Sequence, residues 1–170
     1  SLRLPAYHLD HQGALEYICR GGIDVTMRKI LDRAGLTEEE KNITLAEVND
    51  YFGEAGNKKY DFDEPAAYAE LGEIRRGLEH SRKFRQFLET HSREAMPALE
   101  GYLLQEGLLD EAPMALVDSG WVGSMQKVLN QVLDFISEKN GQRQREPLEG
   151  FYWGLYELPA DADPEKYHCY

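Results

Sequence analysis

The spacing of apolar residues predicts helices over the first two-thirds of the chain. One helix is expected from residue 11 to about 35, with Gly35 as its C-terminal cap. Thr-x-x-Glu patterns at 37–40 and 44–47 have the spacing of a capping box, and the second predicts a helix over 44–54. The apolar side of the first helix is formed by Ile23, Met27, Ile30, Leu31 and Ala34.

The Gly-, Asn- and Asp-rich segment 53–68 is typical of a loop between two groups of helices. After it, the apolar spacing predicts a long helix, a break near Pro97 and a further helix that ends at Gly107. The buried sides of these helices are expected to contain Ile74, Leu78, Phe84, Phe87, Leu88 and His91, and then Met96, Leu99, Tyr102 and Leu103.

The pattern changes to short apolar runs beyond this point. The run APMALVDS, residues 112–119, is bounded by turn residues and predicts a strand near 114–118 that is buried on both faces. An amphipathic helix follows, and the aromatic segment LEGFYWGLYEL predicts a second strand near 149–156. The apolar side of this helix contains Met125, Val128, Leu129, Val132, Leu133 and Ile136.

Strand, helix and strand in this order form a βαβ unit with parallel strands. We therefore expect an α/β fold in which a helix-rich N-terminal part packs on a small parallel sheet. A single domain is expected, with helices in residues 1–110, the βαβ unit in 111–158 and a surface tail in 159–170.

Composition indicates a cytoplasmic protein without membrane insertion. No apolar run approaches the roughly 20 residues that a membrane span requires, and the N-terminus lacks a signal-peptide pattern. Cys19 and Cys169 lie far apart without metal-ligand spacing, which argues against a disulfide framework or a zinc site. Because the first residue is Ser1 and not Met, we expect the chain to be a piece of a larger parent protein.

Charge argues against one class of partner. The formal net charge of −12 at pH 7 would repel a phosphate backbone, so we expect no nucleic-acid partner. The segment HLDH offers His8, Asp10 and His11 as metal ligands, but so short a cluster lacks a complete coordination set. A loop with chance histidines is the favoured interpretation, and no metal site is predicted.

The segment DSGWVGS, residues 118–124, is the candidate binding site. In an open α/β unit a ligand binds beyond the carboxyl ends of the strands, and a helix N-terminus there favours phosphate. The alternative is that these residues only build the turn and cap the helix. The ligand-binding residues predicted from this segment and the helix start are Asp118, Ser119, Gly120, Trp121, Gly123, Ser124 and Gln126.

Aromatic residues of the second predicted strand extend this candidate site. Tyr152 and Trp153, together with Tyr156, have rings that can stack on a sugar or a base. The alternative is that they pack in the core on one side and form a partner surface on the other. The sequence leaves both interpretations open.

The blocks SLRLPA, VDSGWVGSMQ and GFYWGLY resemble, in this order, predicted hydrolases of the haloacid dehalogenase superfamily from bacterial polysaccharide and glycosyltransferase gene clusters. The superfamily's nucleophile motif, an apolar strand that ends in Asp-x-Asp-x-Thr or Val, is absent, since Ser119 and Gly120 follow Asp118. The resemblance implies a downstream segment of such a protein, with phosphate hydrolysis carried elsewhere in the parent chain. No residue is assigned a catalytic role.

The segment ALVDSGWVGSMQKVL is also similar to the ribose-phosphate loop of phosphoribosyltransferases, which grips a 5-phosphate at a helix start. Only one acid is present, and Val122 and Met125 stand where that family prefers threonines. This likeness implies magnesium-dependent binding of a ribose pyrophosphate through Asp118.

Together these observations predict an accessory segment of a hydrolase-like parent that binds a phosphorylated or nucleotide-linked sugar at the strand, Gly-rich loop and helix start. Two alternatives stay open. One is a phosphoribosyltransferase-like enzyme with magnesium, and the other is a non-catalytic protein-interaction module with an exposed aromatic strand face.

Overall fold

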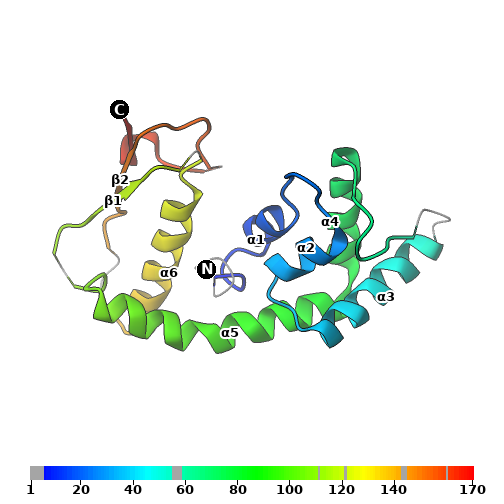
Figure 1. Cartoon of the computed structure of the whole chain (residues 1–170). Coiled ribbons are helices and arrows are strands. Elements are labelled where there is room, and N and C mark those ends of the chain that lie inside the picture. Colours follow the sequence, from blue (N-terminus) through cyan, green and yellow to red (C-terminus); the bar gives the residue numbers. More distant parts are fainter. Residues whose placement is uncertain (1–5, 55–58, 111, 121, 143–144, 160) are drawn as a thin grey trace. The chain divides into compact units, whose positions relative to one another are not determined.

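The computed structural model describes residues 6–54, 59–110, 112–120, 122–142, 145–159 and 161–170. It is helix-rich with a small parallel sheet, which confirms the predicted α/β class (Figure 1). No described helix is long and apolar enough to cross a membrane. The elements are α1 (His11–Ile18), α2 (Met27–Arg33), α3 (Glu38–Glu54), α4 (Leu71–His80), α5 (Arg82–Gln105), β1 (Ala115–Asp118), α6 (Ser124–Lys139), β2 (Glu149–Tyr152) and β3 (Tyr167–Cys169), with single 3-10 turns at Tyr68–Glu70 and Pro164–Lys166.

The chain divides into two compact units, one up to Ala95 and one from Met96 onward. The division lies inside the continuous helix α5 and not near residue 110, where the sequence suggested that the helical part ends. The break predicted near Pro97 is wrong, because α5 runs through this proline. Met96 and Leu99 are buried on the same stretch of helix, so packing outweighs the backbone hydrogen bond that proline cannot make.

A break occurs instead at Ser81, between α4 and α5. Its Oγ accepts a hydrogen bond from the Phe84 amide at 3.0 Å and so satisfies one of the free amides at the start of α5. The hydroxyl also donates to Glu47 Oε2 of α3 at 2.8 Å. Ser81 is buried, so this cap is held by tertiary contacts that the local pattern did not reveal.

The helix predicted over 11–35 is two helices, because the residues between α1 and α2 leave helical geometry. Asp24 has a φ of +50°, and Ile23 is 92% exposed and so does not belong to the buried side. Thr26 then starts α2, since its hydroxyl accepts a hydrogen bond from the Lys29 amide at 3.2 Å. A side-chain cap is the local reason for the second start.

The first of the two predicted capping boxes begins α3. Thr37 Oγ1 accepts a hydrogen bond from the Glu40 amide at 3.3 Å, and the Glu40 carboxylate accepts one from the Thr37 amide at 2.8 Å. The helix start predicted at residue 44 is wrong, because Thr44 lies inside α3 and is completely buried. Both patterns have the same spacing, so only packing distinguishes them.

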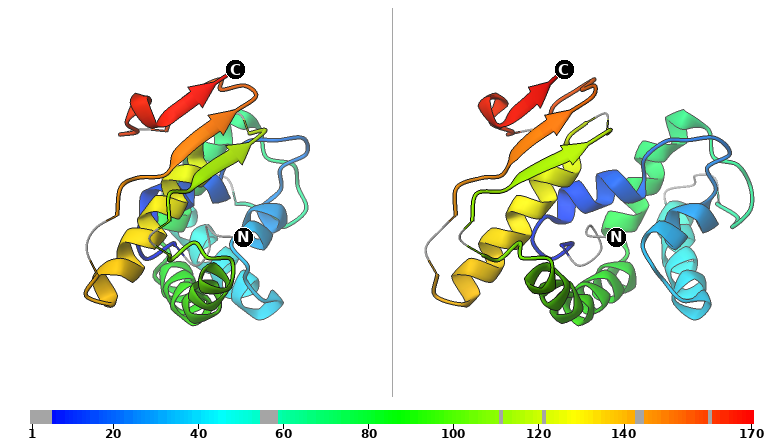
Figure 2. Two further views of the ribbon diagram at one scale, coloured as in Figure 1. Left: turned by 90° about the vertical axis from the view of Figure 1, so that its left-hand side faces the viewer. Right: turned by 60° about the vertical axis from the view of Figure 1, so that its left-hand side comes forward.

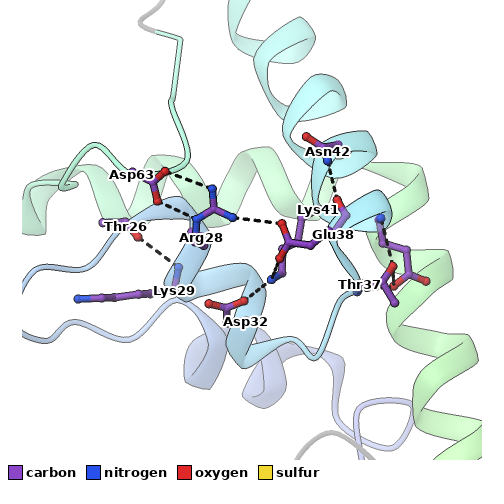
Figure 3. A network of polar contacts seen from close by, with 10 residues as sticks. Thr26, Arg28, Lys29, Asp32, Thr37, Glu38, Lys41, Asn42 and Asp63 are labelled. Carbon is purple, nitrogen blue, oxygen red and sulfur yellow. Dashed lines mark hydrogen bonds and ion pairs between the residues drawn. The ribbon is translucent and has the colours of Figure 1, made fainter.

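A network of ion pairs joins α2, α3 and the segment before α4 (Figure 3). Arg28 Nε donates to Asp63 Oδ1 at 2.7 Å, and Arg28 Nη1 lies 3.2 Å from a Glu38 oxygen. The side chain of Lys41 is only 8% exposed and pairs with Glu38 at 2.7 Å and with Asp32. Asp63 lies in the segment 53–68, which the sequence predicts to be a loop, and its ion pair joins this segment to α2.

Close helix packing forms the apolar core of this first unit. Gly77 of α4 permits the approach of α3, because a Cβ at this position would lie 2.7 Å from the Phe52 ring and 3.0 Å from Val48. The residues of the unit whose side chains are completely buried include Ile30, Leu31, Ile74, Leu78, Phe84 and Leu88.

Three parallel strands in the order β1-β2-β3 form the sheet of the second unit, and α6 packs under one of its faces (Figure 2). In the register, Leu116 lies beside Gly150, and Gly150 lies beside Tyr167. The segment 159–170 is therefore not only a surface tail, because it contains β3. Three strand residues are too few for an apolar alternation that the sequence could display.

The prediction that β1 is buried on both faces is wrong. Val117 is 73% exposed and Ala115 is also exposed, whereas Leu116 and Asp118 are half-buried. Within the described part of this unit, α6 lies against one face of the sheet. The continuous apolar run therefore gives the strand an exposed apolar side.

The ion-pair network of the first unit predicts acid sensitivity. The pKa of Asp63 is lowered by its hydrogen bond to Arg28, and the pKa of Glu38 is lowered first by its hydrogen bond to Lys41. A carboxyl with a lowered folded-state pKa stabilises the fold above its unfolded pKa of about 4 and loses this contribution as the pH falls. We expect the free energy of unfolding, measured by urea denaturation, to fall below about pH 4.

Arg28→Met should flatten this pH dependence, because it removes the partner that lowers the pKa of Asp63. A matched control is Arg76→Met, which removes an exposed guanidinium lying 3.9 Å from Glu73. If both variants keep the same dependence as the parent chain, the network does not cause the acid sensitivity.

Candidate functional site

The carboxyl ends of β1 and β2 lie at the same edge of the sheet, because the two strands are parallel. Ser119 follows β1 and Trp153 follows β2, and both line one open hollow of about 450 Å³. Trp153 is 76% exposed and Tyr156 is 86% exposed, so their rings are accessible. The residues that line the hollow are Ser119, Trp153, Gly154, Leu155 and Tyr156.

The structure thus brings together Ser119 and Trp153 from the predicted set, with Tyr156 beside them. Sequence reasoning missed Gly154 and Leu155, which carry no polar or aromatic group. Their position could have identified them, since they directly follow β2, a strand parallel to β1, and ligands bind beyond the ends of such strands.

Asp118 builds the turn after β1. Its Oδ1 accepts a hydrogen bond from the Gly120 amide at 2.8 Å, and the residue is half-buried. A Cβ at Gly120 would lie 2.6 Å from the Asp118 carboxylate, so this glycine is needed for space and not for a positive φ. The two residues adjoin the hollow in sequence but are not among its lining residues.

Gly123 begins α6 and needs to be glycine for two reasons. Its φ is +62°, and a Cβ would lie 2.6 Å from the Tyr167 ring. Among the described residues no side-chain cap is bonded at this helix end, and Ser124 opens the first turn. The positive end of the helix dipole therefore lies just after the turn. Trp121, also predicted to bind the ligand, lies outside the described residues.

The structure does not bring Gln126, predicted to bind the ligand, to the hollow, because its amide lies completely buried under the sheet. Nε2 donates to the carbonyl of Leu148 at 2.7 Å and to that of Lys166 at 2.9 Å, while Oε1 accepts from the Tyr152 hydroxyl at 2.7 Å. Both amide hydrogens are thus used. A Cβ at Gly150 would collide with this amide, so the glycine provides the space for it.

Tyr152, also predicted to bind the ligand, is likewise not brought to the hollow, since the residue is only 1% exposed. Burial first, and then the neighbouring Tyr167 and Asp118, raise the pKa of Tyr152 to about 12. The phenol therefore stays protonated at neutral pH and donates its hydrogen to Gln126. Its neighbour Trp153 points to the surface, as expected of successive residues at the end of a strand.

The predicted metal-ligand candidates have other partners. His8 Nδ1 lies 2.8 Å from Ser92 Oγ, and Asp10 accepts the Gly13 amide at 2.8 Å at the start of α1. His11 Nε2 lies 3.4 Å from a Glu89 oxygen. Among the described residues there is no group of three or more His, Cys, Asp or Glu side chains that could hold a metal ion.

Comparisons with known proteins identify no relative of this chain. No family model, no curated protein and no solved structure matches this chain. The resemblance to haloacid dehalogenase hydrolases therefore stays a prediction, and the geometry of the hollow carries the functional argument.

Alanine substitutions at Gly123 and Gly141 should distinguish the free-energy cost of a positive φ from the cost of a clash with the Tyr167 ring. Gly123→Ala adds a side chain at positive φ and against the Tyr167 ring, so we expect a loss of about 2–4 kcal/mol in the free energy of unfolding. Gly141→Ala is the matched control, because Gly141 has a φ of +66° with no atom within 4 Å of the added Cβ. Its loss should be about 1 kcal/mol. Equal losses in urea denaturation would contradict the packing role.

Removing the Tyr152 hydroxyl should leave the Gln126 oxygen buried without its donor. We expect Tyr152→Phe to lower the free energy of unfolding by about 1–3 kcal/mol. The exposed Tyr156→Phe should change it by less than about 0.5 kcal/mol. A Tyr152→Phe variant as stable as the parent chain in urea denaturation would refute the structural role of this hydrogen bond.

Proposed function

We propose that the second unit binds a phosphorylated or nucleotide-linked sugar at the hollow beyond β1 and β2. In this proposal the unit serves as an accessory part of a larger hydrolase of the haloacid dehalogenase type. The sequence supports the accessory role, because the nucleophile motif of that superfamily is absent.

One observation carries the proposal: Ser119 and Trp153 leave neighbouring parallel strands at the same edge and line one hollow. Ligands of open α/β sheets bind at such strand ends. Both residues come from loops, which vary without disturbing the sheet that positions them.

The chemistry of the lining favours a sugar or a base. Exposed Trp153 and Tyr156 offer apolar ring faces for stacking, and Ser119 offers a hydroxyl for hydrogen bonding. Phosphate affinity has to arise locally, because residues 96–170 contain 13 acidic and only 5 basic side chains. The start of α6, which follows the turn after Ser119, is the feature of this segment that favours an anion.

A phosphoribosyltransferase-like site fits these residues less well. Magnesium in such a site requires several oxygen ligands, whereas Asp118 is a single acid whose Oδ1 already accepts the Gly120 amide. The described residues around it form no group of acids that could hold a metal.

Removal of the Trp153 ring should weaken ligand binding. With UDP-glucose and glucose 1-phosphate as probes, we expect Trp153→Ala to raise the Kd at least about tenfold, since aromatic stacking contributes about 1–3 kcal/mol. Trp153→Phe should retain part of the affinity because it keeps an aromatic face. Isothermal titration calorimetry on the whole chain measures the Kd of the parent chain and of both variants for each probe.

The control is Tyr68→Ala, which removes an aromatic ring that is also largely exposed from the first unit. The proposal fails if the parent chain binds neither probe, or if Tyr68→Ala and Trp153→Ala lower the affinity equally. Magnesium-dependent binding of ribose pyrophosphate that is lost in Asp118→Asn would favour the phosphoribosyltransferase-like alternative instead.

A further inference from the structure

The sheet of the second unit has one face covered by α6 and an opposite face that we call the open face. Gly150 and Tyr152 contact Gln126 of α6, so their neighbours along β2 point away from this helix. The strand register extends this alternation to β1 and β3. The open face therefore consists of Ala115, Val117, Glu149, Phe151 and His168.

Three residues of the open face, Ala115 and Val117 of β1 and Phe151 of β2, form an apolar patch. Val117 is 73% exposed and Ala115 is exposed. Phe151 lies beside them and stacks on His168, with ring centroids 4.8 Å apart. Parallel sheets occur almost only with both faces covered, and in α/β proteins helices form both covers. A second helix is therefore the expected cover of this face.

The charge of the second unit indicates which kind of partner helix would bind the open face. Glu149 of the open face pairs with Lys166 at 2.8 Å and with His168 at 2.5 Å. The pKa of Lys166 is raised first by its hydrogen bond to Glu149 and also by the charges of Glu146 and Asp163, so further carboxylates act on this lysine. The unit as a whole carries 13 acidic and 5 basic side chains. A basic partner is attracted to this surface, whereas a second copy of this acidic unit is repelled.

We propose that the open face docks an amphipathic helix of a partner, with an apolar stripe on Ala115, Val117 and Phe151 and Lys or Arg side chains along its flanks. Such a helix buries the exposed apolar side chains and places its cations near the surrounding carboxylates. The docking surface differs from the sugar-binding hollow, so it does not depend on the function proposed above.

The test uses the whole chain and two synthetic helical peptides of about 18 residues. Both peptides have the same leucine stripe. The Lys peptide has lysines on both sides of this stripe, and the Glu peptide has glutamates at the same positions. In ¹⁵N-resolved NMR titrations we expect the Lys peptide to shift the amide signals of Ala115, Val117, Phe151 and His168. The Glu peptide should leave these signals unchanged.

Variants locate the contact. Val117→Glu should weaken binding of the Lys peptide at least tenfold, and Ala115→Glu gives the same test at a second exposed position. Leu104→Glu is the control, because it places the same charge on an exposed apolar position of α5 and should leave the Kd within twofold. Far-UV circular dichroism establishes that each variant is folded.

Three results would overturn the proposal. They are the absence of shifts on the open face with the Lys peptide, equal binding of the Glu peptide, and a dimer in sedimentation experiments that Val117→Glu dissociates. The last result would identify a second copy as the occupant. Loss of UDP-glucose binding leaves this proposal intact, because that probe reports on the hollow alone.

Discussion

The second unit depends on one buried side chain, the amide of Gln126. It joins α6 to the carbonyl before β2 and to the carbonyl before β3, and it receives the Tyr152 hydroxyl. Buried amides of this kind stabilise a fold only when their hydrogen bonds are satisfied, and here both hydrogens and the oxygen have partners. The arrangement fixes α6 under the sheet and so sets where the strand ends emerge.

Two surfaces follow from this arrangement. At the strand ends, the loops that begin with Ser119 and Trp153 both contribute to the lining of the hollow. Across the sheet, the side chains that alternate with Gly150 and Tyr152 have no helix of their own unit over them within the described residues. One helix position therefore accounts for the proposed sugar site and for the proposed docking surface, which otherwise involve different residues.

Local sequence signals predicted a large part of the fold. The apolar stripe of α6, the capping box of Thr37 and Glu40, and the parallel pair β1 and β2 all follow from spacing over a few residues. The predictions failed where distant contacts decide. Pro97 lies inside the helix α5. The segment Tyr167–Cys169 becomes a strand because it pairs with β2. Short-range patterns contain no information on such pairing partners.

The sequence by itself determined the strand, the Gly-rich turn and the helix start that contribute Ser119 to the candidate site, because such a succession has few other geometries. Only the tertiary structure added the residues after β2 to this site and decided which side chains at the strand ends are accessible. It turned Gln126 and Tyr152 inward to each other and left Ser119 and Trp153 at the surface. The physical reason is that a strand alternates its side chains between two faces, and the position of α6 selects the face that is buried.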